Sequence, residues 1–478
     1  MIKRLTIAMA AAGIVSGCSM APTYQRPEAP IAGDYPVKTE KATIPATEIG
    51  WQDFFRDARL KALIATALEN NRDLRIAALR IEEARSLYDV QSADRLPNLN
   101  AVAIGSRAGT PADLTTIGTR TVSNRYDVGL RLASFELDFF GRVRSLNDAA
   151  LASYLATEEA QRSAQISLIA EVAKAYLNER AYGEQLELAR RSYEARKSSY
   201  QLAQKRFEVG ATSALDLRQF ETLMDSARVS MVTLARQRAQ AENALVLLTG
   251  KPMGNLPSAQ PLSDQGVLMD IPAGLPSDLL ENRPDIRQYE QRLKAANANI
   301  GAARAAFFPS ITLTAGRGTA SSTLSGLFNA GQGAWSFAPQ LTLPIFDAGR
   351  NMANLDLSET RKNIAIAEYE KTIQTAFREV ADTLVARNLL NEQVDAQAAV
   401  LAASRERLKL SEARYENGIS SSLDVLDAQR ELFSAEQSLV QARLLRLTNS
   451  IDLYRSLGGG LKAQSQAAKP APQQEAKS

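Results

Sequence analysis

Two stretches of this chain follow a helical pattern over an exceptional length. Residues 350–417 contain neither glycine nor proline, and apolar side chains recur there at helical spacing, as at Ile373, Phe377 and Val380. The equivalent stretch 142–209 contains one glycine and no proline. A helix of this length spans about 100 Å at 1.5 Å per residue. The pattern therefore predicts a long, coiled-coil-like assembly of helices with narrow apolar stripes.

Four shorter stretches alternate between apolar and polar residues, as a strand with one apolar face does. The alternation is clear at 335–345, 126–132 and 311–314, and it is weaker near 98–105. Segments of about ten residues with one apolar face are typical of outer-membrane β-barrels. A soluble antiparallel sheet gives the same alternation, so this pattern alone leaves both structures open.

The number of strands decides how such a sheet could enter a membrane. Two halves with two strands each give four strands, whereas the smallest membrane barrels use about eight. Unclosed strand edges are not tolerated in lipid. If these strands enter the membrane, three chains with twelve strands would close a barrel. Polar loops are predicted at 106–123 and 317–334, and the long helices would gather in one tube below the barrel.

The two halves of the chain repeat the same order of elements. The segment 206–216 aligns without gaps with 414–424 at an offset of 208 residues, and Gly141-Arg142 matches Gly349-Arg350 at the same offset. Each half is predicted to hold a helix, two strands, a very long helix and a final helix. The fold class we predict is therefore an α+β membrane protein with an internal duplication.

Proline-rich and low-complexity segments separate and flank the two repeats. The predicted organisation is a signal peptide at 1–17, an extended N-terminal segment at 18–60, a first repeat at 61–250, a linker at 251–283, a second repeat at 284–460 and a disordered tail at 461–478.

The N-terminus has the layout of a bacterial lipoprotein signal. Lys3-Arg4 precedes an apolar stretch at 5–15 that is too short to span a bilayer, and small residues lead to Cys18. This pattern predicts that Cys18 carries diacylglycerol and palmitate, although an incidental cysteine in an ordinary secretory signal is the alternative. The next residue is Ser19 and not Asp, which favours the outer membrane over the inner membrane.

Composition narrows the class of function. The 478 residues carry a formal net charge of only +3, so nothing indicates nucleic-acid binding. The chain contains no histidine, which excludes Ser-His-Asp and Cys-His catalysis and histidine metal sites. We therefore expect no catalytic residue, no metal site and no cofactor beyond the lipid on Cys18. No apolar stretch after the signal approaches 18 residues, so no transmembrane helix is expected.

Several motifs in this order resemble the TolC/OprM family of outer-membrane efflux ducts, on its lipoprotein drug-efflux branch. The segments that carry the resemblance are 51–55 (WQDFF), 136–142 (ELDFFGR), 282–287 (NRPDIR), 344–349 (PIFDAG) and 423–430 (LDVLDAQR). The resemblance implies a homotrimer with a 12-stranded outer-membrane β-barrel, a periplasmic α-helical barrel and a small equatorial domain. It also implies the exit duct of a tripartite pump, with a periplasmic adaptor (a membrane fusion protein) and an inner-membrane transporter of the resistance-nodulation-division (RND) type as partners.

Two glycines are expected to end the long helices in left-handed cap residues, because a new helix starts three residues later in each repeat. The resemblance makes this end the periplasmic tip that meets the adaptor. The predicted adaptor contacts are Val209, Gly210, Ala211, Asn417, Gly418 and Ile419.

The start of the helix after each glycine carries candidate gate residues. Ser213 with Asp216, and Ser421 with Asp424, read as Ser-x-x-Asp capping boxes. Asp427 lies one turn further on and on the same helix face as Asp424, so a trimer would place six carboxylates around its axis. This arrangement resembles the acidic constriction of the family, next to Leu423, and such a ring would favour cations.

Closed-gate links follow from the same segment. Arg430 lies three residues after Asp427, so the two can form a salt bridge. Tyr415 resembles the family's tip tyrosine, for which Asp216 is the expected partner. We hypothesise that Tyr415–Asp216 and Asp427–Arg430 links close the gate and that the adaptor breaks them. A position after Gly418 that can carry a basic gating residue in the family lies in the serine run 420–422 here, which predicts a weaker or differently wired latch.

Three other functions use the same features. The duct could serve type I protein secretion or metal efflux, although Met- or His-rich binding stretches are missing. The chain could also be a non-conducting structural lipoprotein, which predicts monomers or dimers without conductance. An enzyme is the remaining class, and the missing histidines and nucleotide-binding motifs argue against it.

Overall fold

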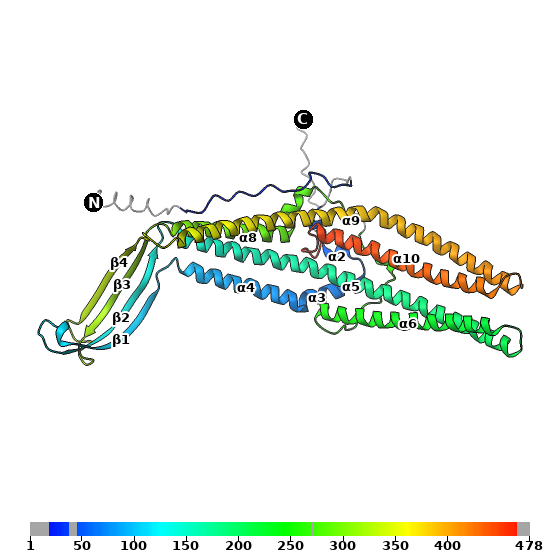
Figure 1. The fold of residues 1–478 in the computed structure, drawn as a ribbon, viewed down its shortest axis with the longest axis horizontal. Helices are drawn as coiled ribbons and strands as arrows, with labels where there is room; N and C mark the ends of the chain where they lie inside the picture. The colour runs from blue at the N-terminus through cyan, green and yellow to red at the C-terminus, as the bar shows by residue number, and fades with distance from the viewer. Residues whose placement is uncertain (1–18, 38–44, 269–270, 466–478) are drawn as a thin grey trace, which may run out of the picture. The chain divides into compact units, whose positions relative to one another are not determined.

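The computed structural model describes residues 19–37, 45–268 and 271–465 (Figure 1). These residues form two compact units, and each unit draws on both repeats. Unit 1 contains the described residues of 1–28, together with 80–158 and 288–370, and unit 2 contains those of 29–79, 159–287 and 371–478. The signal peptide and Cys18 lie outside the described residues, so the lipidation stays a prediction.

Helices dominate the described chain. They are α2 (Trp51–Phe54), α3 (Ala58–Asn70), α4 (Arg72–Ala93), α5 (Arg142–Glu208), α6 (Ala214–Thr249), α7 (Leu279–Asn282), α8 (Pro284–Ala305), α9 (Arg350–Glu416) and α10 (Ser422–Ser456). Short 3-10 turns lie at η1 (Ala46–Glu48), η2 (Ala112–Leu114), η3 (Leu262–Asp264) and η4 (Pro276–Asp278). The two very long helices predicted from the sequence are thus present as α5 and α9, each 67 residues long.

Unit 1 holds one antiparallel sheet in the order β1-β2-β3-β4. The strands are β1 (Leu99–Thr110), β2 (Thr121–Leu137), β3 (Ser310–Ser321) and β4 (Gly333–Thr342). One row of paired residues across the sheet is apolar: Leu99, Leu132, Ala315 and Phe337. The neighbouring row, on the opposite face, is largely polar: Asn100, Arg131, Gly316 and Ser336. The predicted alternation is therefore confirmed, including in β1, where the sequence signal was weak.

The predicted loops were too long. β1 continues to Thr110 and β3 to Ser321, so the connections cover only 111–120 and 322–332. The Gly, Ser and Thr residues at these strand ends weaken the apolar alternation but still offer backbone groups to the ladder. Pairing of the backbone therefore extends the strands beyond the point where the side-chain pattern fades.

The single helix predicted at the start of the first repeat is divided in two, whereas the helix predicted from residue 284 is the undivided α8 (Pro284–Ala305), and α7 (Leu279–Asn282) lies in the predicted linker. In the first repeat, Asn71 adopts an extended backbone between α3 and α4, and its side-chain oxygen accepts from the N–H of Leu74 at 2.9 Å. In the second repeat, Pro284 begins α8, and a proline disfavours helical backbone in the residue before it. Arg283 is accordingly extended and separates α7 from α8.

The core of unit 2 gathers around aromatic side chains from distant parts of the chain. The rings of Phe54 and Tyr454 stack with centroids 4.0 Å apart, and Phe55 meets Phe54 edge-on. All three side chains are fully or almost fully buried. This cluster packs α2 against α10, which fixes the base from which α10 extends.

Residues 461–465, which open the predicted tail, make defined contacts. The carbonyl of Lys462 accepts from the N–H of Trp51 at 3.0 Å, and the Ser465 hydroxyl donates to Asp53 at 2.7 Å. The disorder predicted from residue 461 does not hold for these five residues, and the rest of the tail lies outside the described residues.

Candidate functional site

Each long helix of unit 2 ends in the same hydrogen-bonded turn. Gly210 and Gly418 both adopt the left-handed conformation, with φ of 75° and 70°. The N–H of Gly210 donates to the carbonyl of Phe207 at 2.9 Å, and that of Ala211 donates to Arg206 at 2.7 Å. The same two bonds recur 208 residues later. This is a Schellman motif, and it confirms the predicted left-handed caps. We call residues 206–216 the first tip and residues 414–424 the second tip.

The predicted adaptor contacts are all exposed at these two turns. The side chain of Val209 is 79% exposed and that of Ile419 is 65% exposed. Single exposed apolar residues are common on proteins, but here one stands at the end of each hairpin. The turns are accessible to a partner, and the contact itself stays a prediction.

Asp216 joins the two tips. Its carboxylate and the Ser213 hydroxyl form the predicted capping box at the start of α6. The carboxylate accepts from Ser213 at 2.7 Å, and the bond from Ser213 holds the pKa of Asp216 below its usual range. A further hydroxyl, that of Ser422 on the second tip, donates to Asp216 at 3.2 Å. The serine run after Gly418 is therefore part of the link between the tips.

The second predicted capping box is wrong in its detail. Ser421 does precede α10 as its cap residue, but its side chain makes no hydrogen bond to the helix backbone. The hydroxyl instead donates to the carboxylate of Asp424 at 3.4 Å. The first turn of α10 thus lacks a stabilising bond that α6 has.

The predicted Tyr415–Asp216 link is also wrong within the chain. The Tyr415 hydroxyl accepts from Nη1 of Arg206 at 2.8 Å, and the guanidinium carbon lies 5.7 Å from the centre of the Tyr415 ring. Asp216 is occupied by hydroxyl groups instead, those of Thr212, Ser213 and Ser422. The tips therefore meet through Arg206–Tyr415 and Ser422–Asp216. The packing of the two helical hairpins against each other determines which residue bonds to Tyr415.

The predicted Asp427–Arg430 ion pair is present. Nη2 of Arg430 lies 3.0 Å from the Asp427 carboxylate, with both side chains largely accessible at 70% and 41% exposed. An exposed pair of this kind contributes about 0.2–1 kcal/mol. Its role in a gate stays a prediction.

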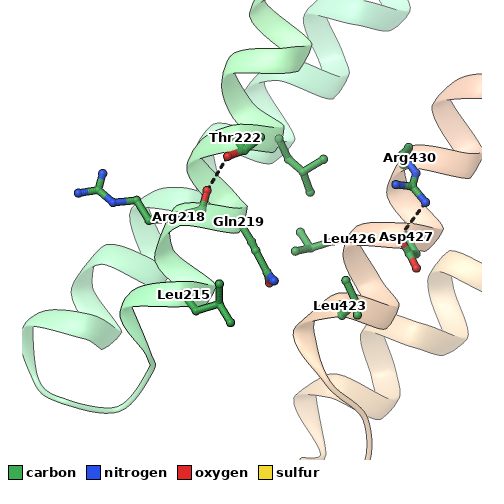
Figure 2. Close-up of a pocket in the computed structure, with 9 residues that line it drawn as sticks. Leu215, Arg218, Gln219, Thr222, Leu423, Leu426, Asp427 and Arg430 are labelled. Carbon is green, nitrogen blue, oxygen red and sulfur yellow. Dashed lines mark hydrogen bonds and ion pairs between the residues drawn. The ribbon is translucent and has the colours of Figure 1, made fainter.

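A cavity of about 370 Å³ lies between the start of α6 and the start of α10. Leu215 and Gln219 point from α6 toward α10, while Leu423 and Leu426 point back toward α6 (Figure 2). The remaining lining residues are Arg218, Thr222, Leu223, Asp427 and Arg430. The cavity thus has an apolar floor, with the Asp427–Arg430 pair on its α10 side.

Equivalent positions of the two repeats face each other across this cavity. At the offset of 208 residues, Leu215 corresponds to Leu423, Gln219 to Asp427 and Thr222 to Arg430. The leucine at this first position is therefore shared, whereas the Asp427–Arg430 pair has neutral counterparts in the first repeat. On α6 the lining residue Arg218 pairs instead with Glu221. Any acidic ring built from this position would draw its charge only from α10.

The sequence interpretation missed Arg206 and Ser422 as site residues. Arg206 stands one turn before Gly210, and Arg414 holds the same place in the second repeat. The recurrence of an arginine at this position in both repeats was a signal for a functional role. It does not show which of the two arginines contacts a tyrosine of the other repeat. Ser422 was included only in the serine run.

Other classes of site were also considered. Across the described ranges, no group of three or more His, Cys, Asp or Glu side chains is arranged to hold a metal ion. No described helix combines the length and apolar character that crossing a membrane requires.

Comparison with known proteins gives the family. The family model described as outer membrane efflux protein matches residues 63–251 and 275–459. A toluene efflux pump outer membrane protein, TtgC, and an antibiotic efflux pump outer membrane protein, ArpC, both from Pseudomonas putida, are each 47% identical over 468 residues, which is 96% of either chain. The open state of the Neisseria gonorrhoeae outer membrane channel MtrE is similar with a TM-score of 0.86 at 45% identity, covering 94% of this chain and all of that chain.

These matches extend over almost the whole chain and include both repeats. They confirm the predicted fold class, in which strands for an outer-membrane β-barrel and long helices for an α-helical barrel occur in one duplicated chain. They also confirm the outer-membrane location and the role as an exit duct of efflux pumps. The chain belongs to the outer membrane efflux protein family, a family of channels.

Proposed function

We propose that three copies of this chain form a passive duct that carries small toxic organic compounds out of the cell, without catalysis. The relatives named for toluene and antibiotic efflux support this class of cargo. Each chain supplies four strands, and twelve strands from three chains would close a barrel. The only attached group in the proposal is the lipid on Cys18. The energy for transport would come from an inner-membrane RND transporter.

The two tips are the proposed docking site for the periplasmic adaptor. Both tips end in rigid Schellman turns that present an aliphatic side chain to solvent, Val209 at the first tip and Ile419 at the second. Burial of such a side chain by a partner contributes about 1.5–3 kcal/mol. Three chains would offer six such turns, so a weak contact at each would add to a firm attachment.

The gate is proposed to lie at the start of α10. Leu423, Asp424 and Asp427 would narrow the duct, and Arg430 would hold Asp427 in place at 3.0 Å. The single observation that carries this proposal is the cavity between equivalent positions of the repeats, because its α10 side carries the acidic Asp427 where its α6 side carries the neutral Gln219. Adaptor binding would separate α10 from α6, which breaks the Ser422–Asp216 contact, and untwisting of α10 itself would break the Asp427–Arg430 pair within that helix.

The test is accumulation of a fluorescent efflux substrate in energised cells that lack the gene or carry a variant. Deletion should raise accumulation, and the wild-type gene should restore it. Val209→Asp combined with Ile419→Asp should behave like the deletion, because a carboxylate cannot be buried against an apolar partner surface. Leu114→Asp changes an equally exposed leucine in the β1–β2 connection and serves as the control.

The outcomes separate the parts of the proposal. Unchanged accumulation on deletion would refute the drug cargo. Normal export by the Val209→Asp, Ile419→Asp variant, with the protein present in the outer membrane, would refute docking at the tips. A defect in Leu114→Asp as well would show that the substitution acts through folding.

A further inference from the structure

Arg196 of α5 is a buried cation close to the proposed gate. Its residue surface is only 6% exposed. Nη1 donates to the backbone carbonyl of Leu223 on α6 at 3.2 Å, and the guanidinium carbon lies 5.8 Å from the ring centre of Phe433 on α10. Its Nε is buried without a hydrogen-bond partner. Arg196 therefore lies where three helices from the two repeats meet.

No carboxylate among the described residues forms an ion pair with Arg196. The charged group that acts on it is another cation, Arg430 on α10. Burial lowers the pKa of Arg196, and the Arg430 charge lowers it further. A buried ion without an opposite charge is unfavourable, because one backbone carbonyl and one aromatic ring replace its water only in part.

The neighbouring repeat shows that this cation is not required for helix packing. At the offset of 208 residues, Arg196 corresponds to Ser404, which is equally buried at 6% exposed. Phe433 corresponds to Asp225, and Arg430 to Thr222. The same backbone position therefore packs with a small neutral side chain in the second repeat. The arginine in the first repeat needs another explanation than space filling.

We propose that Arg196 is a positioning residue of the gate, whose buried charge without an opposite partner keeps the contact of α10 with α5 and α6 weak enough to open. The proposal rests on the gate described above. Separation of α10 would expose Arg196 to water and restore the hydration of its charge. In the proposed gate the Asp427–Arg430 pair within α10 acts in the opposite direction, because it is intact only in the closed state. The open fraction of the duct would then reflect the balance between these two effects.

The test is single-channel recording of the full-length protein in planar bilayers. Arg196→Met replaces the charge by an apolar side chain of similar length. Exchange of buried ionic groups for packed apolar residues often stabilises by about 1–4 kcal/mol, so the open fraction should fall about fivefold or more. Arg196→Lys keeps the cation and should keep an open fraction near that of the wild type. Rescue by lysine separates an electrostatic role from a purely structural one.

Arg446→Met is the matched control. Arg446 is a partly buried arginine of α10 whose Nε also lacks a partner among the described residues, but it lies 16 residues beyond Arg430. At 1.5 Å per residue this is about 24 Å along the helix. Its substitution should leave the open fraction unchanged. If Arg196→Met does not reach the outer membrane as an assembled channel, Arg196→Gln removes the charge with less change in polarity.

Arg430→Ser distinguishes failure of this inference from failure of the gate. If Arg430→Ser leaves the open fraction unchanged, the gate proposal itself is wrong. If Arg430→Ser raises the open fraction but neither Arg196→Met nor Arg196→Gln lowers it, the role of Arg196 is overturned. An equal fall in Arg196→Met and Arg196→Lys would also overturn it, because lysine retains the charge.

Discussion

The first and second tips share a backbone and differ in their side chains. Both have the Schellman turn, with glycine in the left-handed conformation. The first tip then begins α6 with a complete capping box at Ser213, whereas Ser421 begins α10 without one. Behind the tips, the second repeat carries the Asp427–Arg430 pair where the first has Gln219 and Thr222.

This difference indicates that the two repeats have different structural roles. The first tip is held by local hydrogen bonds, so we expect α5 and α6 to keep their positions when the gate opens. The second tip has fewer local bonds, so α10 is the element whose position can change with little cost in local structure. A helix whose first turn lacks a cap opens more easily than a capped one.

The largest effect is expected from substitution of the two turn glycines. A β-branched residue is strained in the left-handed conformation by about 1–3 kcal/mol, so Gly210→Val and Gly418→Val should each distort a tip. Accumulation of a fluorescent substrate should then approach that of the deletion. Gly183→Ala, in the middle of α5, is the control, because alanine favours a helix interior. Normal export by both valine variants would show that docking does not need the turns.

Arg430→Ser should have the next largest effect. Three exposed pairs of about 0.2–1 kcal/mol each would be lost in a trimer, which raises the open fraction about threefold to a hundredfold. Single-channel recordings of the variant and the wild type measure this change.

The double variant Gln219→Asp with Thr222→Arg tests the difference between the repeats, because it builds the same ion pair on α6. We expect that double variant to lower the open fraction in single-channel recordings. No response to the added pair would mean that the position on α10 matters and the charge alone does not.

Backbone features of these tips follow from short sequence signals. A glycine after a long helix, with Ser-x-x-Asp three residues later, predicts the left-handed cap and the capping box because both involve neighbours in the chain. The two 67-residue helices can be predicted equally well from the sequence, since they contain almost no helix-breaking residue. In the second capping box only the Ser421 hydroxyl bond to the Asp424 carboxylate forms, and the sequence pattern gives no sign that the bond from the helix N–H is missing.

Contacts between the repeats could not be predicted in the same way. Arg206–Tyr415 and Ser422–Asp216 join residues more than 200 positions apart, so they depend on how the hairpins pack. The sequence suggested that Asp216 pairs with Tyr415, but in the structure Arg206 bonds to the Tyr415 hydroxyl. Arg196 gave no signal at all, because an arginine in a long polar helix is expected to face water.

Loss of the cap at the first tip should have a smaller and local effect. Ser213→Ala removes the side-chain bond to the Asp216 N–H, which costs about 0.5–2 kcal/mol. Ser421→Ala should cost less, because its hydroxyl makes no such bond. Hydrogen exchange of the first turns of α6 and α10 measures both. Equal acceleration of exchange in the two variants would contradict the proposed difference between the tips.

The smallest effect concerns the Ser422–Asp216 bond between the tips. Ser422→Ala removes one partly exposed hydrogen bond from each chain, and Thr212 and Ser213 still donate to Asp216, so the open fraction should rise only about twofold. Asp216→Asn does not isolate this bond, since it also disturbs the capping box of α6. Ser420→Ala, next in the serine run, is the control because its hydroxyl has no hydrogen-bond partner among the described residues.

The pH dependence of the Ser422→Ala effect identifies the acceptor. The pKa of Asp216 is lowered in the folded chain, so the ionised carboxylate contributes fully above the usual aspartate value of about 3.9. Its contribution is lost only as the pH falls below that value and through the lowered pKa. The ratio of open fractions between Ser422→Ala and wild type should therefore be constant from pH 7.5 to pH 5 and move toward one only as the pH falls below about 3.9. A ratio that already changes between pH 7.5 and pH 5 would show that another group, and not Asp216, accepts the bond that joins the two tips.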